Sequence, residues 1–75
     1  MATCLLYRPA ETRPARFYRI ELAINLFDGV SVLREWGVTG GKGRSTIHLF
    51  RSLREASAAA DRHRKRMLKR GYNRA

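Results

Sequence analysis

The middle of the chain alternates between apolar and polar residues in the pattern of a β-strand. Across residues 16–25, every second side chain points to one face, and that face is apolar: Tyr18, Ile20, Leu22 and Ile24. A short apolar run at residues 4–7 precedes this strand, and a second arm at residues 30–38 follows the turn dipeptide Asp28-Gly29. The pattern predicts an antiparallel hairpin, preceded by a first strand that ends in an irregular connection around residues 9–14.

A second turn and a further strand follow the hairpin. The glycine-rich segment at residues 40–43 predicts a tight turn, and residues 44–50 are rich in β-branched and aromatic side chains. The sequence therefore predicts about four strands, all joined by short connections that suit antiparallel pairing.

Beyond Phe50 the apolar period changes from two to 3.6, the period of a helix. Ser52 and Glu55 have the spacing of a capping box, and Gly71 is placed to end the helix in the left-handed conformation. On a helical wheel one arc is apolar or small and faces the sheet: Leu53, Ala56, Ala60, His63 and Met67. The opposite arc is cationic: Arg54, Arg62, Lys65, Arg66 and Lys69.

This order of elements predicts the α+β class, with a small antiparallel sheet of about four strands and one long C-terminal α-helix packed on it. A length of 75 residues is half that of a usual domain, so we expect a single domain over residues 1–75. Two-domain enzymes are excluded on this ground.

The charge of the chain is strongly one-sided. Sixteen Lys and Arg residues, thirteen of them Arg, stand against six Asp and Glu, which gives a net charge of +10. Residues 62–75 contain seven basic residues and no acid. A surface that only needed to be soluble would interleave both signs, so this asymmetry indicates a polyanionic partner.

The single cysteine, Cys4, indicates a reducing compartment, since it can form neither an internal disulfide nor a cysteine metal site. No apolar stretch has the length of a signal-peptide core or a membrane span. We therefore expect a cytoplasmic protein, with association with the nucleoid as one option.

The motifs of catalysis and cofactor binding are missing from the sequence. Residues 36–43 are glycine-rich, but their spacing does not match a phosphate-binding loop and no helix follows them directly. His48 and His63 have no second ligand at metal spacing, and Glu21 and Glu35 are expected to form ion pairs across the hairpin. We expect no catalytic residue, no metal and no cofactor.

A basic surface with an aromatic residue in it is what remains, and it favours nucleic acid. Cations neutralise phosphates and release counterions, while a flat aromatic ring can stack on a base or a sugar. DNA is favoured over RNA. The rival interpretation is a basic module that docks on an acidic protein partner or the ribosome. The candidate binding residues are Trp36, Arg34, Lys42, Arg44, Arg62, Lys65, Arg66 and Lys69.

From residue 16 to residue 72 the chain resembles the WGR domain. The resemblance rests on Arg16-Phe17-Tyr18, Arg34-Glu35-Trp36-Gly37, the later Gly40 and Gly43, Phe50, the alanine-containing helix, and Gly71-Tyr72. This domain is found in poly(ADP-ribose) polymerases, in bacterial proteins similar to molybdate metabolism regulators, and as small stand-alone bacterial proteins.

The resemblance implies a DNA- or RNA-binding role, because in the polymerases the domain contacts DNA near a strand break. The motif's Trp and Arg meet the sugar and phosphate of a terminal nucleotide there. Trp36 matches the first, but Val38 stands where the motif has its Arg, so the corresponding phosphate contact is missing. Trp36 shares the strand face of Val30 and Val32, so the sequence leaves open whether it belongs to the core or to a binding surface.

Overall fold

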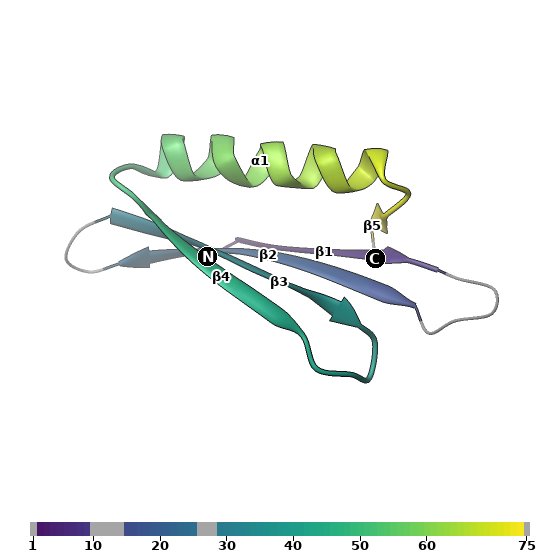
Figure 1. The fold of residues 1–75 in the computed structure, drawn as a ribbon. Coiled ribbons are helices and arrows are strands. Elements are labelled where there is room, and N and C mark those ends of the chain that lie inside the picture. Colours follow the sequence, from purple (N-terminus) through teal and green to yellow (C-terminus); the bar gives the residue numbers. More distant parts are fainter. Residues whose placement is uncertain (1, 10–14, 26–28, 75) are drawn as a thin grey trace.

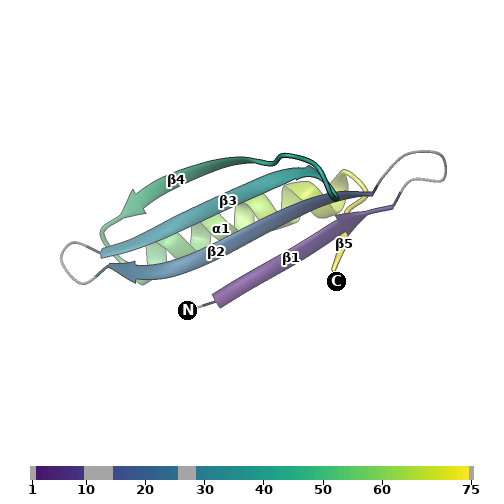
Figure 2. The same cartoon turned by 90° about the horizontal axis from the view of Figure 1, so that it is seen from below.

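The fold is a five-stranded antiparallel sheet with one helix across one face (Figure 1). The computed structural model describes residues 2–9, 15–25 and 29–74. Its elements are β1 (Ala2–Arg8), β2 (Arg16–Asn25), β3 (Gly29–Val38), β4 (Arg44–Phe50), α1 (Leu53–Lys69) and β5 (Asn73–Arg74). The order across the sheet is β4-β3-β2-β1-β5 (Figure 2). The predicted α+β class is confirmed, and a fifth strand that the sequence did not indicate is added.

Two of the expected connections lie outside the described residues. They are residues 10–14 of the proline-containing segment and Asp28 of the turn dipeptide. The glycine-rich turn is described: the amide of Gly41 donates to the carbonyl of Val38 at 2.9 Å, and Gly40 has φ +84°. This is a tight turn of the kind that requires a left-handed residue at its third position.

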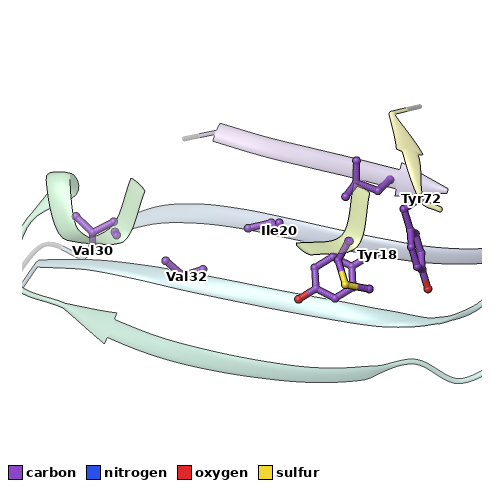
Figure 3. Packing of buried hydrophobic residues seen from close by; sticks show 8 residues of the cluster. Tyr18, Ile20, Val30, Val32 and Tyr72 are labelled. Atoms are coloured by element: carbon purple, nitrogen blue, oxygen red, sulfur yellow. The ribbon is translucent and has the colours of Figure 1, made fainter. Parts of the chain in front are cut away.

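The strand register puts the even-numbered side chains on the face that the helix covers. Tyr18 of β2 lies opposite Leu6 of β1 on one side and Trp36 of β3 on the other. The core forms along these rows and is drawn in Figure 3, with Leu6 and Val32 as its largest fully buried side chains. The apolar side chains that define the period-two pattern of β2 thus lie on the inner face of the sheet.

The helix is held close to the sheet by small residues. Its N-cap, Ser52, accepts a hydrogen bond from the amide of Glu55 at 3.2 Å, as predicted for a capping box. Ala56 and Ala59 are buried against the strands, but Leu53 is 53% exposed, so its predicted place in the buried stripe was wrong. A helical wheel assigns a face to each residue but does not show how much of that face the sheet covers.

The C-terminal end of the helix turns the chain back to β1. Gly71 has φ +95°; its amide donates to the carbonyl of Leu68, and the amide of Tyr72 donates to that of Met67. These two bonds form a Schellman motif, which confirms the predicted role of Gly71. Tyr72 is buried, and the residues after it pair with Leu6 and Tyr7 as β5.

Gly37 and Gly43 permit a close approach between the ends of β3 and β4. A Cβ on Gly37 would lie 3.0 Å from Cα of Gly43, and a Cβ on Gly43 would lie 3.3 Å from the ring of Phe17. The ring of Phe17 therefore covers both glycines on the sheet face away from the helix. Because these contacts hold the turn against the sheet, they also fix the position of Trp36 next to it.

Candidate nucleic-acid interface

Trp36 is half-buried on the helix side of β3, as part of a stack of aromatic rings. Its indole stacks on Tyr18 with ring centroids 6.1 Å apart and planes 22° apart, and Tyr18 meets Tyr72 edge-on at 6.2 Å. The guanidinium carbon of Arg34 lies 5.6 Å from the centroid of the indole. Trp36 therefore packs on the core with part of its surface and remains open with another part, so both interpretations that the sequence left open hold in part.

A hollow of about 390 Å³ lies beside this stack, between the sheet and the last turns of α1. Its walls contain the rings of Tyr18, Trp36 and Tyr72, together with His63 and Met67. We call it the arginine hollow, because five arginines complete its lining: Arg8, Arg16, Arg34, Arg66 and Arg70. They come from β1, β2, β3, α1 and the turn after α1, so only the folded chain brings them together.

Carboxylates do not neutralise these arginines within the part of the chain that the structure describes. The three ion pairs there join Arg19 to Glu21, Arg19 to Glu35 and Arg64 to Asp61, all outside the hollow. The expected ion pair across the hairpin is confirmed for Glu35, whereas Glu21 pairs with Arg19 of its own strand. Five unneutralised guanidinium groups around one cavity produce a strongly positive potential in it.

Arg34 and His63 occupy the inner wall of the hollow. Nη1 of Arg34 donates to the phenol oxygen of Tyr18 at 3.4 Å and lies 3.4 Å from Nδ1 of His63. A guanidinium can only donate, so this last contact requires an unprotonated Nδ1. The pKa of His63 is lowered from its ordinary value of 6.5 by burial and, next, by the positive charges of Arg34 and Arg66. The ring is therefore kept neutral at pH 7.

A second, shallower hollow of about 310 Å³ lies on the other side of Trp36. Arg16 and Trp36 line both hollows, and Lys42 and Arg44 from the glycine-rich turn line the second. The two hollows thus form one basic track that passes over Trp36. Val38 lines the second hollow, half-buried and directly opposite Arg16.

The candidate residues from the sequence separate into two groups in the fold. Trp36, Arg34, Lys42, Arg44 and Arg66 all line the basic track. The remaining three, Arg62, Lys65 and Lys69, are exposed on α1 and do not line it.

Sequence reasoning did not select Arg8, Arg16, Arg70 or Tyr72 for the site. The alternation of β2 already places Arg16 on the same face as Tyr18, and this signal could have identified it. For Arg70 and Tyr72 the signal was Gly71 between them, since a Schellman turn reverses the chain toward the sheet. Arg8 could be found only from the register of β1, where it pairs with Arg16.

A metal-binding cluster and a membrane-spanning helix are both absent from the described residues. No three of their His, Cys, Asp and Glu side chains are grouped so that they could hold a metal ion. Within the same residues, no helix combines the length and apolar character that crossing a membrane requires.

Comparisons with known proteins gave one match. The family model described as WGR domain matches residues 1–75. Searches of the curated proteins and of the solved structures found no match.

Proposed function

Since the chain belongs to the WGR domain family, whose model covers it from end to end, we propose that it is a nucleic-acid-binding module without catalytic activity. WGR domains are binding modules of the nucleic-acid-binding type, found in proteins like the poly(ADP-ribose) polymerases. DNA is the proposed partner, on the ground of this family membership.

The observation that carries the proposal is the basic track on either side of Trp36, whose arginines have no carboxylate partner among the described residues. A guanidinium offers several N–H donors in a fixed plane and binds phosphate oxygens with two parallel hydrogen bonds. Five arginines around one hollow therefore form a binding site for a backbone phosphate. Lys42 and Arg44 line the second hollow, where they would bind the next phosphate of the strand.

Trp36 is proposed to contact a sugar of the bound strand. Tyr18 already covers one face of the indole, so the ring is not free to intercalate between two bases. A sugar between two phosphates has the size and apolar character to rest on the part of the indole that is open. Recognition through phosphate and sugar predicts little preference for base sequence.

A salt titration tests this proposal. If about 4 to 6 cations meet phosphates, the slope of log K against log salt on duplex DNA should be roughly −4 to −5. The same titration with single-stranded DNA and RNA determines which polymer is preferred. A slope near zero would overturn the proposal.

Competition experiments address the rival interpretation of an acidic protein partner or the ribosome. Inorganic polyphosphate and short, unlabelled DNA duplexes with defined ends are added separately to a complex of the protein with labelled DNA. The two competitors are compared at equal concentrations of phosphate charge. If only the DNA displaces the labelled DNA, binding depends on the geometry of nucleic acid. Equal displacement by both would point to a surface that recognises negative charge alone.

A further inference from the structure

On the face of the sheet away from the helix, which no other described element covers, exposed apolar side chains lie at both ends of the strands and charged ones lie between them. This face carries the odd-numbered side chains of the four long strands, and Figure 2 views the sheet from this side, with α1 behind it. Ile47 and Leu49 of β4 are 66% and 71% exposed, and Ile47 lies directly opposite Leu33 of β3. Leu5, Tyr7 and Phe17 form a second apolar group at the other end of the strands. Exposed apolar area of this extent on a small domain marks a contact surface.

The charge of this open face differs from that of the rest of the molecule. Its charged side chains in the strands are Arg19, Glu21 and Glu35, and both carboxylates lie 3.0 Å from the arginine. One positive and two negative groups give this face a net charge of −1, on a chain whose net charge is +10. It is therefore a surface on which two copies of the chain can meet without strong electrostatic repulsion.

We propose that a second copy of this chain packs on the open face, sheet against sheet, to form a homodimer. An interface between identical patches must be self-complementary, and this face offers both an arginine and carboxylates at its centre, with apolar residues at both ends. Facing sheets pack about 10 Å apart with their side chains interdigitated, which would bury Ile47 and Leu49.

The face is large enough for a small but specific dimer interface. β2 and β3 have ten residues each and are therefore about 33 Å long, and four strands about 4.8 Å apart make the face about 19 Å wide. Two faces of about 600 Å² would bury about 1,200 Å² in total, which is the lower limit for specific, stable interfaces. Pairing through the free edge of β4 is another way in which two copies could meet, but it would leave Ile47 and Leu49 exposed to water. The face-to-face arrangement is independent of the proposed function, because the arginine hollow lies on the helix side.

Sedimentation velocity on the wild-type chain and three variants tests the dimer. The wild type is expected to sediment as a dimer at about 100 µM and to dissociate on dilution. Leu49→Glu and, independently, Ile47→Glu should weaken the dimer at least about thirtyfold, because each places an unpaired carboxylate in the interface. Leu53→Glu is the matched control: this leucine is also exposed, but it lies on α1 and should leave the dimer intact.

Circular dichroism shows whether each variant is folded, which is expected since all three side chains are more than half exposed. A wild type that stays monomeric at about 500 µM overturns the proposal, as does a dimer that both Glu variants of β4 retain. Hydrogen exchange separates the two arrangements. Face-to-face packing leaves the outward amides of β4 exchanging at the same rate in dilute and concentrated samples, and protection of these amides on concentration would show edge pairing instead.

Discussion

Among single residues, Trp36 belongs both to the packed core and to the proposed binding surface. Its contacts with Tyr18 and Arg34 fix the ring orientation, and the same contacts hold the guanidinium of Arg34 at the wall of the arginine hollow. Removing the indole would therefore loosen the core and the hollow together. Substitutions on the rim of the track are the better probes, because they leave this stack in place.

Val38→Arg restores the basic residue that the family motif has at this position. Val38 is half-buried, shares the strand face of Trp36 and lines the second hollow, so an arginine there could reach a phosphate next to a sugar on the indole. We expect about tenfold tighter DNA binding, the value of one charge-assisted contact, and a larger gain for nicked or end-phosphorylated DNA than for an uninterrupted duplex. Fluorescence anisotropy with the three DNAs measures this.

The stability of Val38→Arg should decrease only slightly. Arg16 lies directly opposite position 38, and like charges facing each other across a sheet cost up to about 1 kcal/mol. A loss of several kcal/mol in the free energy of unfolding, without any gain in affinity, would show instead that position 38 belongs to the core.

His63 makes stability depend on pH. Because its pKa in the folded protein is below the ordinary value of 6.5, the unfolded chain binds more protons than the folded one between these two pKa values. The contribution of His63 to the free energy of unfolding is therefore complete above about pH 6.5, and it is lost as the pH falls through the pKa of the folded state. Denaturant unfolding at about pH 5 and about pH 8 should show a smaller decrease for His63→Gln than for the wild type.

Among the elements, α1 contributes to the candidate site with its C-terminal end, whereas the cations on its outer side only add to the net positive charge of the molecule. Arg66→Glu should weaken DNA binding about tenfold or more and reduce the magnitude of the salt slope by about one, because Arg66 lines the arginine hollow. Arg62→Glu, the same charge reversal one turn earlier and outside the hollow, should change affinity less than about threefold. Equal losses in an anisotropy titration would mean that binding depends on total charge rather than on the hollow.

The packed side of α1 predicts a large difference between two alanines. Ala56 is fully buried against the sheet, so Ala56→Glu would bury a carboxylate without a partner and cost about 3 kcal/mol or more. Ala58 is exposed on the same helix, and Ala58→Glu should change stability by no more than about 0.5 kcal/mol. Thermal unfolding followed by circular dichroism compares them directly.

The elements themselves could be predicted from the sequence wherever one local rule acted alone. The alternation of residues 16–25 matches β2, and Ser52 and Gly71 bound the helix as expected. β5 could not be predicted, because a strand of two residues has no detectable period. These residues form a strand because Tyr72, which precedes them, enters the core beside β1. The arginine hollow could not be predicted either: Arg8 and Arg70 are far apart in sequence and meet through tertiary pairing.

At the scale of the whole molecule, the sheet separates two surfaces of different character. The helix side holds the arginine hollow, whereas the open face is nearly neutral and has exposed apolar side chains at both ends of its strands. If two copies pair through their open faces, their two hollows point in opposite directions. Such a dimer could hold two segments of nucleic acid at once, and its avidity for long DNA would exceed that of a monomeric variant such as Leu49→Glu.

Strand order also has a consequence for how the chain folds. The first four strands lie next to their neighbours in sequence, and β5 alone joins distant parts, pairing residue 74 with residue 6. Contacts between sequence neighbours form quickly, so refolding of the meander and helix is expected within milliseconds. The junction of β5 with β1 closes the longest loop, and we expect it to be the first to open in native-state hydrogen exchange. Arg8, Arg70 and Tyr72 all lie at this junction, so the hollow would be the last part of the molecule to be assembled and the first to be lost.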